Sequence, residues 1–232
     1  MSNKIEIYID GLSSKLIKKN VSKKIKGYTY NPSLFAAAGV KNYLLTCKNI
    51  SKAVYPRPVS LEVIADDYKN MITQATKLSK LNKNIYVKIP ITYTNGKYTT
   101  DVIDQLIRSK IKLNITAVFN LMQVKRILPF IKNTRSIISV FVGRIYDSGF
   151  DAATEVRKIV KYTKKNSKCR ILWASTRQVY DIKLAEKENC DIITVDYSIF
   201  KKIKLFNKHW KKFSLETVRQ FYSDAIKSNF KI

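Results

Sequence analysis

Glycine and proline are scarce in this chain: its 232 residues include only 6 glycines and 5 prolines. Linkers and low-complexity segments are rich in these two residues, so their scarcity argues against a flexible connection between domains. The sequence also has no internal repeat at the spacing of solenoids or propellers. Because 45% of the residues are hydrophobic, which is enough for a substantial core, we expect a single domain over residues 1–232.

Histidine and cysteine are rarer still. The chain has one histidine, His209, and three cysteines, Cys47, Cys169 and Cys190, which lie far apart and form no CxxC pair. Zinc sites are built mainly from these two residue types, so we expect no metal site. An odd number of separated cysteines is typical of reduced thiols in a cytoplasm rather than of a disulfide framework.

Long hydrophobic runs are absent as well. No stretch approaches the roughly 20 apolar residues that span a bilayer. The first ten residues, MSNKIEIYID, carry charges and lack the apolar region of a secretory signal. We therefore expect a cytoplasmic protein with no membrane partner.

Acidic residues are few beside basic ones: 17 Asp and Glu stand against 44 Lys and Arg, which gives a formal net charge of +27. An excess of this size can indicate nucleic-acid binding. However, only 9 of the basic residues are arginines, and the lysines are spread along the whole chain. Phosphate-binding surfaces concentrate their charge and favour the arginine fork, so we expect no nucleic-acid partner. The positive field would still attract a small anionic substrate.

What the chain does contain is a regular alternation of strand-like and helix-like segments. The strand-like segments are 5–10, 27–31, 59–63, 84–89, 112–118, 137–143, 170–175 and 191–196. Eight such alternations predict a parallel sheet, and about 230 residues suit the smaller barrels. We predict an α/β fold, a single (β/α)8 TIM barrel with a C-terminal helix. An open doubly wound sheet is the alternative, but no GxGxxG turn follows the first strand.

Helix signals are clear in three segments. Residues 151–165 open with Asp151 as the expected N-cap, and the C-terminal helix, in residues 213–225, has Ser214 in that role. Residues 65–81 have apolar residues three and four apart. The expected buried stripe of that segment is Ala65, Tyr68, Ile72, Ala75 and Leu78.

Alternation within the strands sorts their side chains into two faces. In a parallel barrel the apolar face packs against the helices and the alternate face points inward. Barrel enzymes place their chemistry at the C-terminal ends of the strands, so inward residues near those ends are candidate site residues. They are Asp10, Thr29, Asn31, Glu62, Lys88, Asn114, Thr116, Ser139, Phe141 and Ser175.

Lys88 is the expected centre of this site. Its strand, NIYVKI, otherwise looks like part of a core, and burying an ammonium beside two carboxylates is costly unless they pair. With no metal ligands, no phosphate-cradling glycine loop and no Ser/His pair nearby, the amine most naturally acts as a nucleophile toward a carbonyl, without a cofactor. Condensation with a ketone gives an iminium ion, an electron sink for breaking or forming the adjacent carbon–carbon bond. Asp10, Glu62 and Thr116 suit the proton transfers that this needs.

These residues lie in motifs that resemble those of the transaldolase family, in its short form that includes fructose 6-phosphate aldolases. GYTYNPS (27–33) is similar to the family's TTNPS turn. VSLEV, VKIPIT, LNITAVF, SVFVGRI and ASTRQ follow in the family's order, and FSLETVRQFYSDA resembles its closing helix. The resemblance covers essentially the whole chain.

The resemblance implies a role for each inward residue. Lys88 matches the Schiff-base lysine, Asp10 the acid/base aspartate, and Glu62 with Thr116 the pair that holds the catalytic water. The family's contacts to sugar hydroxyls fall on Thr29, Asn31, Asn114 and Ser139. Its phosphate ligands fall on Arg144, Ser175 and Arg177.

Three functions remain open on these residues. The first is transfer of a dihydroxyacetone unit from a ketose phosphate, such as fructose 6-phosphate or sedoheptulose 7-phosphate, to an aldose phosphate of the pentose phosphate pathway. The second is an aldolase that releases dihydroxyacetone. The third is a basic binding protein on a catalytically silent barrel. Within the family, transfer enzymes carry Glu and Phe where this chain has Glu62 and Phe141, which favours transfer.

Three positions depart from the family's pattern: Tyr30 replaces a second threonine, Val140 a proline and Thr176 an aromatic residue. Thr176 bears on the shape of the phosphate pocket, because it lies between Ser175 and Arg177.

The resemblance also implies a homo-oligomer, a pentamer or a decamer made of two rings. The expected contact is the C-terminal helix, whose apolar stripe is Leu215, Val218, Phe221, Tyr222, Ala225 and Ile226.

Overall fold

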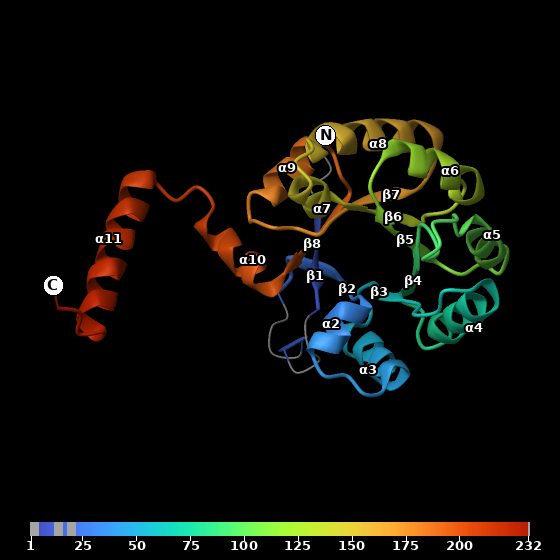
Figure 1. Ribbon diagram of the computed structural model, residues 1–232, viewed down its shortest axis with the longest axis horizontal. Helices are drawn as coiled ribbons and strands as arrows, with labels where there is room; N and C mark the ends of the chain where they lie inside the picture. Colours follow the sequence, from blue (N-terminus) through green and yellow to red (C-terminus); the bar gives the residue numbers. More distant parts are fainter. Residues whose placement is uncertain (1–4, 12–15, 18–21, 232) are drawn as a thin grey trace. The chain divides into compact units, whose positions relative to one another are not determined.

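A computed structural model describes residues 5–11, 16–17 and 22–231 of the protein (Figure 1). The chain consists of two compact units, residues 1–200 and 201–232. The expectation of one domain over 1–232 stays a prediction. So does the absence of a signal region, since part of the first ten residues lies outside the described ranges.

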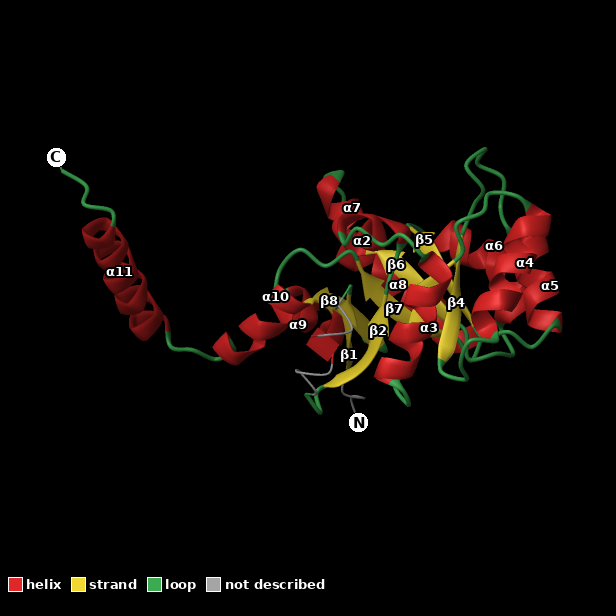
Figure 2. Ribbon diagram, turned by 90° about the horizontal axis from the view of Figure 1, so that it is seen from below, coloured by secondary structure: helices red, strands yellow, loops and turns green. Residues whose placement is uncertain are grey.

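Eight parallel strands form a closed barrel in chain order, which confirms the (β/α)8 prediction. β1 closes the barrel by pairing with β8 as well as with β2. Helices surround the strands in both views (Figures 1 and 2). The strands are β1 (Glu6–Asp10), β2 (Ile25–Thr29), β3 (Val59–Glu62), β4 (Ile85–Pro90), β5 (Leu113–Val118), β6 (Ile137–Phe141), β7 (Arg170–Ala174) and β8 (Ile192–Asp196).

Helices follow the strands and cover the outside of the barrel. Those within the first unit are α2 (Pro32–Ala37), α3 (Tyr43–Val54), α4 (Tyr68–Ser79), α5 (Thr100–Arg108), α6 (Leu121–Ile131), α7 (Val142–Asp147), α8 (Ala152–Asn166) and α9 (Asp181–Lys187), and α10 (Tyr197–Lys202) crosses the boundary between the two units. Short polar side chains begin several of them. Asp151 accepts a hydrogen bond from the Thr154 amide, as predicted, and Asn120 with Gln123 forms a capping box at α6.

The buried stripe of α4 differs from the prediction. Met71, Ala75 and Leu78 are its buried residues, whereas Tyr68 is 44% exposed and Ile72 only half-buried. Asp67 caps the helix by accepting from the Asn70 amide. The helix therefore starts at Tyr68, leaves Ala65 outside it, and turns Met71 rather than Ile72 toward the barrel.

The lower part of the barrel is filled by apolar side chains. Tyr8, Leu172 and Ile192 belong to a buried cluster that also contains Ile137 and Ala174. The backbone of Gly27 approaches the Tyr8 ring so closely that an added Cβ would lie 2.5 Å from it. The polar inward residues that line the site lie at the C-terminal ends of the strands.

The C-terminal unit contains η1 (Ile203–Leu205) and α11 (Trp210–Lys227). The N-cap of α11 is His209, whose ring accepts from the Lys211 amide, so the prediction of Ser214 was wrong. The helix begins a turn earlier than the apolar pattern suggested, which places Ser214 inside it. No residue of α11 is buried, and Phe221 and Tyr222 are 67% and 70% exposed. Among the described residues, none of the helices is both long and apolar enough to cross a membrane.

Candidate active site

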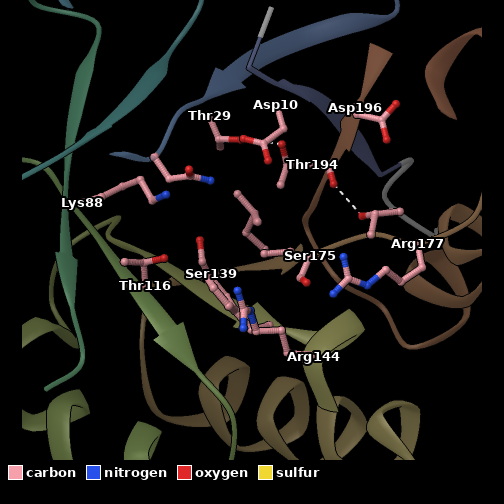
Figure 3. Close-up of a pocket in the computed structure, with 15 residues that line it drawn as sticks. Asp10, Thr29, Lys88, Thr116, Ser139, Arg144, Ser175, Arg177, Thr194 and Asp196 are labelled. Carbon is pink, nitrogen blue, oxygen red and sulfur yellow. Dashed lines mark hydrogen bonds between the residues drawn. The ribbon is translucent and has the colours of Figure 1, made fainter. Parts of the chain in front are cut away.

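A cavity of about 300 Å³ lies at the C-terminal ends of the barrel strands (Figure 3). Ten of the twelve predicted site residues line it. They are Asp10, Thr29, Asn31, Lys88, Thr116, Ser139, Phe141, Arg144, Ser175 and Arg177. The other two, Glu62 and Asn114, contact lining residues from behind. Alternation along β1, β2, β4, β5 and β6 turns six of these side chains inward, and the segments after β2, β6 and β7 supply the other four.

Lys88 is buried on β4, with only 5% of its surface exposed. Its Nζ lies 2.9 Å from Oε2 of Glu62, its neighbour in register on β3. The same nitrogen donates to the backbone oxygen of Tyr30 at 3.0 Å. Burial of the amine is thus offset by one ion pair and one hydrogen bond, and Glu62 is placed to exchange a proton with it.

Asp10 ends β1 on the inner face, opposite Thr29 in the β1–β2 register. The Thr29 hydroxyl donates to Asp10 Oδ1 at 2.7 Å. Burial raises the pKa of the Asp10 carboxyl above its usual range, while the charge of Lys88 and the Thr29 hydrogen bond oppose that rise. A carboxyl with a raised pKa beside an amine suits the transfer of protons near neutral pH.

The wall beside Lys88 is a polar network. Asn114 is fully buried on β5; its amide donates to Ser60 at 3.0 Å and its Oδ1 accepts from Ser139 at 2.7 Å. Asn114 therefore orients Ser139, and its expected contact with sugar hydroxyls stays a prediction. The Thr116 hydroxyl is buried and has no hydrogen-bond partner within the described residues. Such a group is available to a substrate or a water molecule.

Two arginines lie across the cavity from Lys88. Arg144 comes from α7 and Arg177 from the loop after β7, and Figure 3 shows both on the far side from the lysine. Arg177 also forms an ion pair with Asp147 at the surface, with Nε 3.3 Å from Oδ1. The cavity thus has a nucleophile at one end and cationic groups for an anion at the other.

The loop that carries Ser175 and Arg177 is held in an unusual shape. Ser175 has φ of +62°, a conformation that costs energy for residues other than glycine. Gly143 permits it, because a Cβ at that position would lie 1.7 Å from the Ser175 carbonyl oxygen. The Arg177 amide donates to Oδ2 of the buried Asp181 at 2.9 Å, which fixes the other side of the loop.

The sequence prediction missed five lining residues, of which Leu172 and Ala174 are apolar and belong to the buried cluster. Thr194 and Asp196 of β8 line the cavity, and Thr176, noted above only as a departure, does so too. The alternation of inward and outward side chains, continued through residues 191–196, would have predicted Thr194 and Asp196, because both lie on the same face of the strand as Ile192.

The comparisons with known proteins give one family. The sequence model described as Transaldolase/Fructose-6-phosphate aldolase matches residues 7–232. A protein named "Probable transaldolase" from Carboxydothermus hydrogenoformans is 34% identical over 197 residues, which are 84% of this chain and 88% of the relative. One of the same name from Clostridioides difficile is 33% identical over 224 residues, 91% of this chain and 100% of the relative.

Similar solved structures agree on the fold alone. N-acetylneuraminate lyase from Mycoplasma synoviae has a TM-score of 0.60 at 12% identity, covering 97% of this chain and 82% of its own. The putative copper homeostasis protein CutC from Streptococcus agalactiae has a TM-score of 0.63 at 11% identity, and the match covers 82% of this chain and 97% of the CutC chain.

Proposed function

The chain belongs to the transaldolase/fructose-6-phosphate aldolase family, and we propose that it is a transaldolase acting through a Schiff base on Lys88. It would move a dihydroxyacetone unit from a ketose phosphate, such as fructose 6-phosphate or sedoheptulose 7-phosphate, to an aldose phosphate. The observation that carries the proposal is one buried amine, paired with Glu62 and close to Asp10, across a cavity from two arginines. The names of the relatives support the same class of enzyme.

The first step is condensation of the amine with the ketone. Lys88 gives up a proton, for which Glu62 is the adjacent acceptor at 2.9 Å. The neutral nitrogen adds to the carbonyl carbon to give a carbinolamine. Its hydroxyl then takes the proton held by Glu62 and leaves as water, which gives an iminium ion and restores the carboxylate. The unpaired Thr116 hydroxyl and the Glu62 carboxylate are suited to hold that water.

The second step breaks the bond between the third and fourth carbons of the donor. Asp10, as the carboxylate, takes the proton of the hydroxyl on the fourth carbon. The electrons of the broken bond move into the iminium, so an aldose phosphate leaves and an enamine stays on Lys88. Addition of the enamine to an acceptor aldehyde reverses these movements, with Asp10 returning the proton.

The substrate phosphate is the ligand proposed for Arg144, Ser175 and Arg177. Guanidinium groups bind phosphate through paired, charge-assisted hydrogen bonds. Their place opposite Lys88 suits an extended sugar phosphate with its ketone at the amine (Figure 3). Thr29, Asn31 and Ser139 line the space between and are the proposed contacts of the sugar hydroxyls.

Transfer, rather than release of dihydroxyacetone, is favoured by Phe141. It lines the cavity and packs against Phe119 with ring centroids 6.2 Å apart. A phenyl ring has no hydroxyl with which to protonate the enamine, so the enamine survives until an acceptor arrives. An aldolase that releases dihydroxyacetone is the alternative within the family.

Assembly and location complete the proposal. A homo-oligomer, a ring of five or a pair of rings, would cover the exposed apolar residues of α11. The protein would act in the cytoplasm, consistent with three cysteines that are all free.

Borohydride reduction in the presence of fructose 6-phosphate tests the reaction. The wild type should gain the mass of the reduced dihydroxyacetone adduct on the peptide that contains Lys88, and Lys88→Ala should gain none. Trapping of Lys88→Ala at the wild-type level would refute the assignment. If fructose 6-phosphate is cleaved at the same rate with and without erythrose 4-phosphate as acceptor, the protein is an aldolase that releases dihydroxyacetone rather than a transferase.

A further inference from the structure

Thr194 is a buried hydroxyl at the edge of the cavity that no role above includes. It lies on the inner face of β8 with 5% of its surface exposed, and it lines the cavity. Its Oγ1 lies 2.6 Å from the Oγ1 of Thr29. Thr29 in turn donates to Asp10 Oδ1 at 2.7 Å, so three side chains from β8, β2 and β1 form one hydrogen-bonded row.

The direction of this row follows from counting protons. A hydroxyl has a single proton to donate. Thr29 gives its proton to Asp10, so its oxygen must accept in the contact with Thr194. Thr194 is therefore the donor whenever Asp10 is ionised, and its hydrogen bond holds the Thr29 hydroxyl turned toward the carboxylate.

The same row serves a protonated Asp10. The carboxyl can then donate to Thr29, Thr29 can donate to Thr194, and every bond of the row reverses without movement of a heavy atom. One geometry therefore supports both protonation states of Asp10. The proposed reaction requires this, because Asp10 acts as both a base and an acid within each turnover.

Thr176 fixes the position of Thr194. The β7–β8 ladder pairs Leu172 with Ile192 and Trp173 with Ile193, and β7 ends at Ala174. Beyond that point the Thr176 hydroxyl donates to the Thr194 backbone oxygen at 2.6 Å. A side chain of the loop between the proposed phosphate ligands therefore holds the end of β8 in place.

We propose that Thr194 is a positioning residue, which orients the carboxyl of Asp10 through Thr29 for the proton transfers of the reaction. The role rests on the proposed function, because it requires Asp10 to act as acid and base. Thr194 acts through Thr29, whose hydroxyl lies between it and the carboxyl of Asp10.

The charged groups that face Asp10 stay the same when this hydroxyl is removed. They are Lys88 on β4, Glu62 on β3 and Asp196 on β8. Thr194→Val keeps the branched shape and removes the hydroxyl alone. Thr29 then loses the donor that orients it, its hydrogen bond to the ionised carboxyl weakens, and the carboxyl becomes harder to ionise.

The test measures trapping, turnover and pH dependence on the intact protein. Thr194→Val should form the borohydride-trapped adduct on Lys88 as the wild type does, with KM for fructose 6-phosphate within about twofold. Its kcat should fall about three- to tenfold, the effect of one hydrogen bond. The acid limb of its kcat profile should move to higher pH. Thr194→Ser, which restores the hydroxyl, should recover kcat and the wild-type profile.

Thr163→Val is the matched control, because Thr163 is fully buried on α8 and its hydroxyl has no hydrogen-bond partner within the described residues. Should Thr194→Val fail to fold, Thr194→Ala takes its place in the same measurements. Turnover and pH profile equal to wild type in the variant without the hydroxyl would overturn the positioning role alone. Failure of Thr194→Ser to recover kcat would overturn it as well. A wild type that traps no adduct would overturn the proposed function and this role with it.

Discussion

Nζ of Lys88 lies 2.9 Å from Oε2 of Glu62, and the two side chains are only 6% and 14% exposed. A pair this deep is coupled in stability, because removal of either partner takes the nearest counterion from a buried charge. Glu62→Ala should therefore lower the free energy of unfolding by about 3–5 kcal/mol. The double variant Lys88→Met/Glu62→Ala should recover most of that loss. Urea unfolding of the wild type, both single variants and the double variant measures the coupling. Additive effects would mean that the pair contributes nothing.

Replacement of Arg144 or Arg177 by Ala should raise KM for phosphorylated sugars about ten- to a hundredfold, since a hydrogen bond to a charged group contributes about 1.5–3 kcal/mol. Binding of dihydroxyacetone, which has no phosphate, should change little. Arg108→Ala is the control, because Arg108 pairs with Asp104 at the surface. Equal losses on dihydroxyacetone would show that the arginines support the fold instead.

Asp10→Asn should abolish turnover and stabilise the fold at neutral pH. Burial raises the folded-state pKa of Asp10 above that of the unfolded chain, so the folded protein binds the proton more tightly and loses stability as pH rises between the two values. Thermal unfolding should show the variant more stable at pH 7, with the gap closing below about pH 4, near the unfolded value.

Asp67 provides the control of opposite sign. Its pKa is lowered by hydrogen bonds from Asn70, so its contribution to stability is present above the unfolded pKa and is lost as pH falls. Asp67→Asn should therefore be less stable than wild type near neutral pH, with a smaller gap in acid. The same direction of change in both variants would contradict the account of Asp10.

A chain that ends at His209 should be smaller in solution than the intact protein. It lacks α11, where Leu215, Val218, Phe221, Tyr222 and Ile226 are each 48–70% exposed. Static light scattering at 0.15 M salt, where exposed charges are screened beyond about 8 Å, should show an oligomer for the intact chain and a monomer for the shortened one. Phe221→Glu tests the stripe without a truncation. A monomeric intact chain at micromolar concentration rules the ring out.

Much of the barrel could be predicted because its signals are local. Alternation along each strand depends on the period of two residues, so the eight strands and the inward set that includes Asp10 and Lys88 could be read from their own segments. The face that each helix buries was harder to predict. In α4 an error of one residue separates Met71 from Ile72, and both are apolar, so the pattern alone did not select the buried one.

The contacts that involve β8 could not be read in the same way. Thr194 meets Thr29 across 165 positions of sequence, and only closure of the barrel through β1 brings them together. The pairing of Arg177 with Asp147 likewise depends on the loop after β7 folding back over α7. Such contacts follow from tertiary geometry, which has no signature in either segment.

The close fit of the Tyr8 ring against Gly27 has a kinetic consequence. The ring and the apolar cluster around it fill the inside of the barrel, and the cavity lies at the C-terminal ends of the strands. Under the proposed function the departing aldose and the incoming acceptor would share this space in turn, while the three-carbon unit stays on Lys88 as the enamine. Under the proposed function, double-reciprocal plots at several acceptor concentrations should therefore be parallel lines, the pattern of an exchange in which the first product leaves before the second substrate arrives.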